Sequence, residues 1–283
     1  MTKKKVGILN PGMMGISVAA TIQNSGHDVL WASEKRSKQS ITRAKEHNLI
    51  DIMTLEALCQ QCEALVSVCP PHAAAELADD VIAQGFKGLY VDANAIAPQK
   101  AKRIGKKMKD NGVAFVDGGI IGGPAWQAGR TWLYLSGDGA GDAEALFASG
   151  PLETEIISEE IGNASALKMC FAANSKGTTA LLSAIMAAAE TLGVRDALER
   201  QWSRGNSEFA TQTQNRVQQV TAKAWRFAGE MEEIAATLED ANLPSGFHDA
   251  AGDIYRRMAH FKDAPGLPQL IEVLNALLDN SEQ

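Results

Sequence analysis

Cysteine, aromatic residues and long apolar runs are all scarce in this chain. Its 283 residues include 4 cysteines and only 6% aromatic residues. So few thiols exclude a small secreted fold that depends on disulfides. No stretch reaches the roughly 18 uninterrupted apolar residues of a membrane span. The apolar run of residues 6–9 is also shorter than the about seven residues of a signal-peptide core. We therefore expect a cytoplasmic protein with no membrane partner.

Positive charge is also in short supply. The chain has 27 basic and 34 acidic side chains, for a net charge of −7, and its clustered lysines lie at residues 3–5 and 100–109. This balance excludes nucleic acid as the main expected partner. The remaining composition, 45% hydrophobic and 22% charged, is that of a globular protein long enough for one large or two ordinary domains.

The cysteines give no metal-binding pattern. Cys59 and Cys62 have the spacing of a redox motif or of half a zinc site, but no second such pair and no paired histidines accompany them. We expect reduced thiols and no metal.

The first half of the chain alternates short β-rich runs with helical segments, which is typical of a parallel sheet flanked by helices. Strands are expected at residues 5–10, 28–32, 64–68, 88–92, 114–118 and 132–136. Helices are expected at residues 13–25 and 98–111. This pattern predicts an α/β fold, with a doubly wound, mostly parallel Rossmann domain over residues 1–161.

The second half, residues 162–283, favours an all-helical domain, because Ala, Leu, Glu, Gln and Arg recur there with helical periodicity. One helix, nearly apolar on every side, is expected over residues 164–192, ended by Gly193 as a C-cap. Further helices are expected at residues 196–204, 207–228, 231–242, 245–260 and 268–279.

A dinucleotide-binding turn follows the first expected strand. Its residues are Asn10, Pro11, Gly12, Met13, Met14 and Gly15, the GxGxxG pattern with asparagine at the first glycine. Gly12 would let the backbone approach a diphosphate, and Gly15 would let the helix pack closely on the strand. Asn10 can replace the turn glycine if it adopts left-handed backbone angles, which asparagine tolerates.

The choice between NAD and NADP is read after the second expected strand, where Ser33, Glu34, Lys35, Arg36 and Ser37 follow one another. Cations and hydroxyls at this place accept the phosphate of NADP, whereas an acid binds the ribose of NAD. We expect NADP, and Glu34 keeps NAD as the alternative.

The end of the third expected strand should also border the cofactor site. Val68, Cys69 and Pro70 follow that strand directly. Strand ends of an open parallel sheet line its ligand site, so we expect these three residues beside the cofactor.

Several motifs in order resemble the beta-hydroxyacid dehydrogenase superfamily, which includes 6-phosphogluconate dehydrogenase, 3-hydroxyisobutyrate dehydrogenase and the imine reductases. The likeness begins with the run from Val6 to Gly15 and continues through Gly26-His27-Asp28-Val29. The chain is most similar to a little-characterised branch with its own helical C-terminal domain. The resemblance implies an oxidoreductase that binds NAD(P) and a dimer in which C-terminal domains pack together.

The superfamily's substrate motifs are altered here. Asp-x-Ser-Thr-x-x-Pro resembles residues 92–98, with Asn94 at the serine and Ala95 at the threonine. An aspartate followed by a Ser-Gly-Gly turn resembles residues 117–123, with Ile121 at the serine before Gly122 and Gly123. In the family these groups hold the substrate carboxylate, so the resemblance implies that Asn94, which also borders the cofactor, and the two glycine amides face a different head group.

Lys168 is the expected catalytic residue. A lysine in the first turns of an otherwise apolar helix is costly to bury unless it is paired or deprotonated, and a lowered pKa would let it donate or accept a proton near neutral pH. Gly162 to Lys168 also matches the superfamily's Gly-x5-Lys motif, which implies the same role. The family's asparagine four residues on is Ala172 here, so we expect local polar support from Ser165, Ser175 and Thr179.

Two further residues are candidates for the substrate site. His248 lies at an expected helix start, where a capped helix with an exposed histidine explains it equally well. Trp126 follows Gly123-Pro124-Ala125 and could form an apolar substrate wall, or it could anchor its loop.

Together these features predict an NADP-preferring dehydrogenase or reductase that acts on a small hydroxy or oxo compound, as a homodimer, with its active site between the two domains. One alternative is an imine reductase, which acts on a C=N bond. Another is a sensor that binds NAD(P)H without turnover, since several family residues are replaced.

Overall fold

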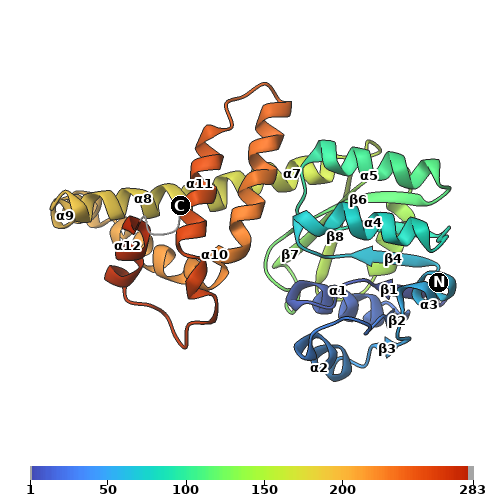
Figure 1. Ribbon diagram of the computed structural model, residues 1–283. Coiled ribbons are helices and arrows are strands. Elements are labelled where there is room, and N and C mark those ends of the chain that lie inside the picture. The colour runs from blue at the N-terminus through green and yellow to red at the C-terminus, as the bar shows by residue number, and fades with distance from the viewer. Residues whose placement is uncertain (1, 280–283) are drawn as a thin grey trace. The chain divides into compact units, whose positions relative to one another are not determined.

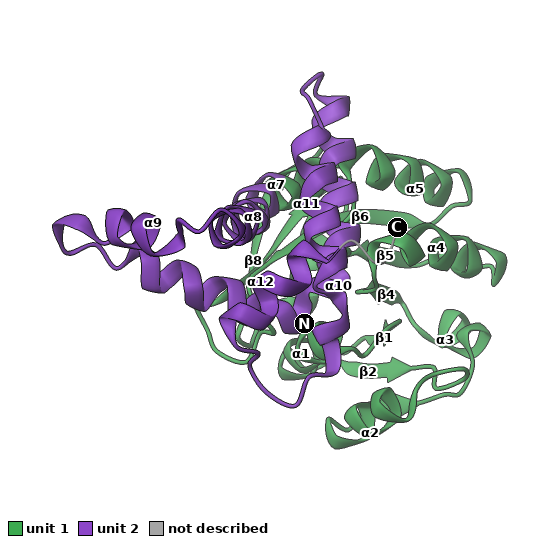
Figure 2. Ribbon diagram, turned by 60° about the vertical axis from the view of Figure 1, so that its left-hand side comes forward, with its two compact units in different colours: residues 1–169 green, residues 170–283 purple. Residues whose placement is uncertain are grey.

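The computed structural model describes residues 2–279. The chain forms two compact units, residues 1–169 and 170–283, coloured separately in Figure 2. The boundary falls inside helix α7 (Asn163–Ala172), so Lys168 belongs to the first unit.

The first unit is built on one sheet with the strand order β3-β2-β1-β4-β5-β6-β7-β8. The strands β1 to β6 run parallel, β7 is antiparallel to β6, and β8 is parallel to β7. This confirms the predicted doubly wound, mostly parallel α/β sheet. The strand bounds are β1 (Lys5–Ile8), β2 (Asp28–Trp31), β3 (Ile50–Asp51), β4 (Ala64–Ser67), β5 (Leu89–Asp92), β6 (Ala114–Ile121), β7 (Thr131–Ser136) and β8 (Leu152–Ser158).

Two apolar cores cover the two faces of this sheet. One contains the buried side of α1 together with residues of α6, and the other contains residues of α3, α4 and α5 (Figure 1). The central strands are buried on both faces, which explains their continuous apolar runs. The helices of this unit are α1 (Met13–Asn24), α2 (Lys38–Glu46), α3 (Leu55–Gln61), η1 (Pro71–Ala73), α4 (Ala74–Ala83), α5 (Pro98–Asp110), α6 (Ala140–Glu144), η2 (Ala145–Phe147) and most of α7.

All six predicted strands are present, and two more were missed. Strand β3 is two exposed residues long, too short to produce a pattern. Strand β8 lies at the edge of the sheet and carries Glu153 and Glu155. Acidic residues are depleted in strands, so their presence hid an edge strand whose side chains are largely in contact with solvent.

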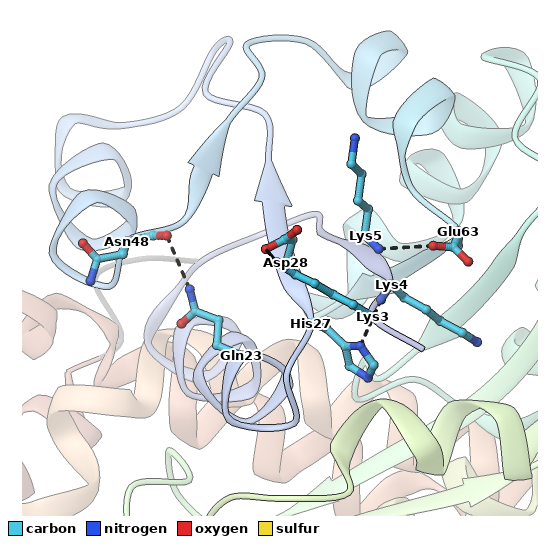
Figure 3. A network of polar contacts seen from close by, with 8 residues as sticks. All are labelled: Lys3, Lys4, Lys5, Gln23, His27, Asp28, Asn48 and Glu63. Atoms are coloured by element: carbon cyan, nitrogen blue, oxygen red, sulfur yellow. Dashed lines mark hydrogen bonds and ion pairs between the residues drawn. The ribbon is translucent and has the colours of Figure 1, made fainter. Parts of the chain in front are cut away.

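Figure 3 shows the polar contacts that join the segments at the amino end of the sheet. Lys3 forms an ion pair with Asp28 at 2.8 Å, and the amide of Lys4 donates to Nδ1 of His27 at 3.2 Å. The amide of Lys5 donates to the side chain of Glu63 at 3.3 Å. The N-terminal lysines therefore contact the first residue of β2 and the residues directly before β2 and β4, at the edge opposite the carboxyl ends of the strands.

The second unit is helical, as predicted. Helix α10 packs along α11 and α8 within this unit (Figure 1). Its elements are the π-helical turn η3 (Ala173–Gly177), α8 (Thr178–Thr191), α9 (Arg195–Trp202), η4 (Arg204–Asn206), α10 (Phe209–Asp240), α11 (Gly246–Arg257), η5 (Ala259–Asp263) and α12 (Leu270–Leu278). Gly193 follows α8 with a φ of +67°, as expected of a C-terminal glycine.

The single helix predicted over residues 164–192 is wrong in one respect, because η3 interrupts it. Within the second unit, the hydroxyl of Tyr255 donates to the carbonyl of Lys176 at 2.8 Å. A β-carbon placed on Gly177 would lie 2.9 Å from Nε2 of His248, so that ring occupies the space beside the turn. These tertiary contacts, which periodicity cannot show, accompany the extra residue in the helix.

The two helices predicted at residues 207–228 and 231–242 are in fact one, α10. Gly229 stays helical. Phe227, Met231 and Ile234 are buried along one side of the continuous helix, and their packing outweighs the roughly 1 kcal/mol that a helical glycine costs.

Over residues 2–279 no helix combines the length and apolarity that a membrane crossing requires.

Candidate functional site

The carboxyl ends of the parallel strands gather most of the predicted site residues at one edge of the first unit. Turns after β1, β2, β4, β5 and β6 meet there because these strands are parallel neighbours. In open α/β sheets this edge is where ligands bind.

The turn after β1 is shaped to receive an anionic group. Gly12 is the N-cap of α1, a β-carbon there would have open space within 4 Å, and among the described residues no side chain caps the helix. Its first turn also holds no acidic residue. A β-carbon at Gly15 would clash with the carbonyl oxygen of Asn10, so only glycine fits there. Uncapped amides and the positive end of the helix dipole suit the diphosphate of a dinucleotide.

Asn10 does not take the left-handed conformation expected of it, since it is absent from the residues with positive φ. The turn closes instead through a hydrogen bond from the amide of Gly12 to the carbonyl of Asn10 at 2.8 Å. With its amide oxygen turned toward Arg36, Asn10 accepts from Nη1 of that residue at 3.0 Å. Arg36 also donates to the carbonyl of Leu9 at 3.0 Å, so it fastens the loop after β2 to the glycine turn.

The loop after β2 lines a cavity of about 320 Å³ beside the glycine turn. Glu34 and Lys35 are exposed in its wall, and Arg36 is half-buried there. Burial lowers the pKa of Arg36. Ser33 is half-buried before the loop, and Ser37 caps α2 by accepting from the amide of Ser40 at 3.2 Å. The cavity therefore combines two cations with three acids, Glu34, Glu76 and Asp80, at the place where the dinucleotide's ribose is expected.

The end of β4 is held to the end of β5 by Asn94. Its Oδ1 accepts from the amide of Cys69 at 2.5 Å, and its Nδ2 donates to the hydroxyl of Ser67 at 3.0 Å. Asn94 is 2% exposed, and the second hydrogen on its Nδ2 takes no part in these two bonds. Val68 lies next to Gly15, and Pro70 is exposed at the start of η1. Burial raises the pKa of the Cys69 thiol to about 11.

A row of polar side chains that the sequence analysis missed crosses the sheet beneath this edge. Ser67, Asp92, Asp117 and Ser136 are register neighbours on β4, β5, β6 and β7, and all are buried. Two aspartates facing one another across buried strands are the signal that could have revealed it. Burial, with Asp117 nearby, raises the pKa of the Asp92 carboxyl to about 7. Its Oδ2 has no hydrogen-bond partner among the described residues.

Asp117 accepts four hydrogen bonds. Its Oδ2 accepts from the amides of Gly162 and Ser165 at 3.0 and 2.9 Å and from the hydroxyl of Ser136 at 3.0 Å. Its Oδ1 accepts from the hydroxyl of Ser165 at 2.6 Å. Ser165, predicted to face the substrate, therefore uses its hydroxyl proton on this carboxylate. Burial raises the pKa of Asp117, and these bonds oppose the rise.

Lys168 lies one turn after Ser165 on α7 and is half-buried. A β-carbon placed on Gly119 would lie 3.0 Å from Cβ of Lys168 and 2.5 Å from the carbonyl of Ala164. Asp117 thus meets the start of α7, and Gly119, two residues further along β6, meets the next turn. The helix therefore runs along β6 toward the carboxyl edge, the edge that holds the glycine turn.

The loop from β6 to β7 crosses this edge toward α1 and α2. Gly122, with a φ of +128°, and Gly123 are both exposed, which leaves their amides accessible. The amide of Ala125 donates to the hydroxyl of Ser17 at 2.9 Å. Trp126 stacks on His47 with ring centroids 5.1 Å apart, which anchors the loop, while 46% of its surface stays exposed.

His248 belongs to the second unit, residues 170–283. It is 7% exposed, packed against Gly177 and Phe247, so the exposed histidine considered above is wrong. Burial lowers the pKa of its ring.

Ser175 and Thr179, expected to support Lys168, donate to backbone carbonyls of their own helix, those of Phe171 and Ser175. Within residues 2–279, no three His, Cys, Asp or Glu side chains group as metal ligands.

Two family models match the chain. The model for the NAD binding domain of 6-phosphogluconate dehydrogenase matches residues 5–147, and that for a domain of unknown function (DUF1932) matches residues 189–258. The chain is 26% identical over 179 residues to an uncharacterized oxidoreductase of Bacillus subtilis, which covers 59% of this chain and 60% of the relative. It is 28% identical over 164 residues to an uncharacterized 28.5 kDa protein of Methanothermus fervidus, covering 58% and 62%. The matches thus span about three fifths of these relatives.

Solved structures share the fold over nearly the whole chain. The conserved protein MTH1747, of unknown function and structurally similar to 3-hydroxyacid dehydrogenases, has a TM-score of 0.67 at 25% identity, with 92% of this chain and 100% of that one covered. The 3-hydroxyisobutyrate dehydrogenase of Mycobacterium tuberculosis has a TM-score of 0.68 at 15% identity, with 98% and 100% covered. An imine reductase of Myxococcus stipitatus in complex with NADP+ has a TM-score of 0.54 at 19% identity, with 97% and 100% covered.

The dinucleotide-binding match extends from β1 to η2 and takes in the glycine turn, the cavity after β2, Asn94 and Asp117. Because it spans half of the chain and the fold agrees with it, this protein belongs to the family of the NAD binding domain of 6-phosphogluconate dehydrogenase.

Proposed function

We propose that this protein is an NADP-preferring oxidoreductase that reduces or oxidises a small hydroxy or oxo compound, with Lys168 as the residue that transfers the proton. One observation carries the proposal. Helix α7 runs along β6 so that Lys168 follows Gly119 toward the edge where Gly12 opens α1. A lysine and an anion-binding helix start on one rigid unit suit hydride transfer coupled to proton transfer.

When bound, the reduced nicotinamide supplies a hydride to the carbon of the substrate's double bond. The ammonium of Lys168 then donates a proton to the substrate oxygen as the alcohol forms, and the amine recovers its proton from solvent. In the opposite direction the neutral amine accepts the hydroxyl proton. A lysine suits both directions because its ammonium form donates a proton and its neutral amine accepts one.

The preference for NADP rests on the loop after β2. Lys35 is exposed in the cavity wall with a φ of +59°, and Ser37 caps α2 beside it. Arg36 is held to the glycine turn, since its guanidinium donates to the carbonyl of Leu9. We assign the phosphate chiefly to Lys35, with Arg36 contributing charge and shape. Glu34, Glu76 and Asp80 lie in the same wall and oppose the phosphate, so the preference should be moderate.

The substrate's head group should differ from a simple carboxylate held by hydroxyls. The side chain of Asn94 accepts a hydrogen bond from the amide of Cys69 and donates one to the hydroxyl of Ser67. Ile121, which stands where the superfamily motif has a serine, is buried. We assign the head group to the second amide hydrogen of Asn94 and to the amides of Gly122 and Gly123. This reduced set favours a substrate with a weaker anion or none, which keeps reduction of a C=N bond as the second candidate.

Oxidation of NADPH and NADH, followed at saturating protein with a panel of 2- and 3-oxoacids, aldehydes and cyclic imines, tests the proposal. We expect turnover with at least one carbonyl compound and a lower KM for NADPH than for NADH. Turnover confined to cyclic imines would replace the proposal with the second candidate. Saturable NADPH binding without turnover across the panel would instead make the protein a nucleotide sensor.

A further inference from the structure

Helix α7 begins without a side chain of its own at the cap. The residue before its first turn is Gly162, with a φ of +101°, which has no side chain to accept a hydrogen bond from the first amides. The first amides of any helix lack partners inside the helix and need acceptors from elsewhere. The start of α7 therefore depends on other parts of the sheet.

Three of the first four amides find their acceptors on two neighbouring strands. Asp117 on β6 accepts from the amides of Gly162 and Ser165, and Ser136 on β7 accepts from the amide of Ala164 at 3.0 Å. The amide of Asn163 donates to the carbonyl of Glu160 at 3.3 Å. Each amide from residue 162 to 165 thus has an acceptor.

The carboxylate of Asp117 is central to this arrangement. It also accepts from the hydroxyls of Ser165 and Ser136, so it joins β7 to α7 through β6. It is fully buried and lies at the positive end of the helix dipole, where a negative charge is favoured. Four donors on a buried carboxylate hold it in one orientation, and they hold the helix start with it.

The position of Lys168 follows from that of the helix start. Lys168 lies three residues beyond Ser165, about 4.5 Å along the helix axis. Its Cβ rests against Gly119, which is two residues beyond Asp117 on the same face of β6. A shift or fraying of the first turn would move the lysine along this contact.

We propose that Asp117 is the positioning residue for Lys168: it caps α7 from the neighbouring sheet and so fixes where the lysine's amine stands at the carboxyl edge. The inference rests on the proposed function in taking that amine as the proton donor. Asp117 itself touches neither substrate nor cofactor in this role. Misplacement of a reacting group by about 1 Å can cost a factor of about 100 in rate, so a lost cap is sufficient to impair turnover.

The test compares Asp117→Ala and Asp117→Asn with a control, Val81→Ala, which should lower the stability of the first unit by a similar amount without touching the start of α7. Val81 is fully buried in α4, in the core on the α3–α5 face. In Asp117→Ala the amides of Gly162 and Ser165 lose their acceptor. In Asp117→Asn one amide oxygen can still accept from both, so this variant should recover part of the effect.

Two readouts do not need turnover. Hydrogen exchange of the amides at residues 162–169 should become at least about tenfold faster in Asp117→Ala and stay within about twofold in Val81→Ala. Competitive acylation of lysines across a pH series, read by mass spectrometry, should show the labelling profile of Lys168 shifted in Asp117→Ala alone, while Lys100 serves as the internal reference.

The third readout is turnover with the substrate found in the panel. Asp117→Ala should lower kcat by about 10- to 100-fold with the Kd for NADPH within about twofold of wild type, and Asp117→Asn should fall between. Faster exchange with unchanged kcat and an unchanged Lys168 profile would reduce Asp117 to a structural cap and overturn the inference. Unchanged exchange would overturn it too. If wild type turns over nothing, the proposed function fails, while the exchange and labelling results still decide the role of Asp117.

Discussion

The buried carboxyl of Asp92 should make the stability of the first unit depend on pH in an unusual direction. Burial beside Asp117 raises its pKa from 3.8 to about 7. Asp117 has four donors, whereas Asp92 accepts from the amide of Asn94 at 3.0 Å and has an unpartnered Oδ2 among the described residues. Of the two, Asp117 is the one stabilised as a carboxylate, and Asp92 retains its proton.

The direction of this pH dependence follows from the protons that Asp92 binds in the folded and the unfolded chain. Between about pH 4 and pH 7 the folded chain holds a proton on Asp92 that the unfolded chain has released, so the free energy of unfolding falls as pH rises through this window. A gap of about three pH units corresponds to about 4 kcal/mol, fully developed above pH 7. About 1 kcal/mol of this should appear between pH 6 and pH 8. Lys100 acts in the opposite sense by favouring the carboxylate, but burial is the larger effect.

Asp92→Asn isolates this contribution. The amide has nearly the same shape, keeps an oxygen for the amide of Asn94, and stays neutral at every pH. The variant should be more stable than wild type at pH 8, by up to about 4 kcal/mol, and the advantage should shrink as pH falls. Urea unfolding, followed by tryptophan fluorescence at several pH values, gives the difference in the free energy of unfolding between the two proteins. The titration of the histidines contributes equally to both and cancels in this difference.

Asp110→Asn serves as the control. Asp110 is an exposed carboxyl at the end of α5, paired with Lys106 at 2.6 Å. Above pH 6, the free energy of unfolding of Asp110→Asn should change with pH in the same way as that of wild type. If wild type and Asp92→Asn also run parallel from pH 6 to pH 8, the argument that Asp92 is a buried neutral acid is refuted.

Four further outcomes are expected. Lys168→Ala should lower turnover by about 100-fold or more and leave the Kd for NADPH nearly unchanged; unchanged turnover would remove the lysine from the mechanism. Gly15→Ala should destabilise the free protein, because its new β-carbon clashes with Asn10, whereas Gly12→Ala should leave thermal stability alone and weaken cofactor binding; equal melting temperatures for the two would contradict this. Lys35→Ala should raise the KM for NADPH more than that for NADH, and a parallel change would argue against a phosphate contact there. Light scattering of the intact chain should give the mass of a homodimer, and a monomer at micromolar concentration would exclude it.

Local sequence patterns were sufficient wherever one segment's own residues decide its structure. The apolar runs of β1, β4 and β5 are buried on both faces, and such runs are typical of parallel strands whatever lies beside them. Helix α5 spans Pro98–Asp110 against a prediction of 98–111, because proline at its start and one apolar stripe mark it locally. The glycine turn was located in the same way.

Patterns failed where another segment decides. The helix predicted over residues 164–192 contains a π-helical turn beside the ring of His248 and the hydroxyl of Tyr255, both distant in sequence. Gly229 is typical of a helix end, yet α10 continues through it because the buried side of the helix is packed along its whole length. Asn10 reads as a left-handed turn residue, yet its side chain meets Arg36.

The sequence by itself determined the fold class, the place of the dinucleotide turn and the lysine to examine, since each depends on periodicity or on residues close together in the chain. Only the tertiary structure decided that Asp92 and Asp117 are register neighbours and that Asp117 caps the helix carrying Lys168. Strand pairing brings Asp92 beside Asp117, and the hydrogen bonds of Asp117 reach residues 45 and 48 positions further along the chain. A single sequence has no local signal for such pairs, because hydrogen bonding and desolvation between them exist only once the sheet has formed.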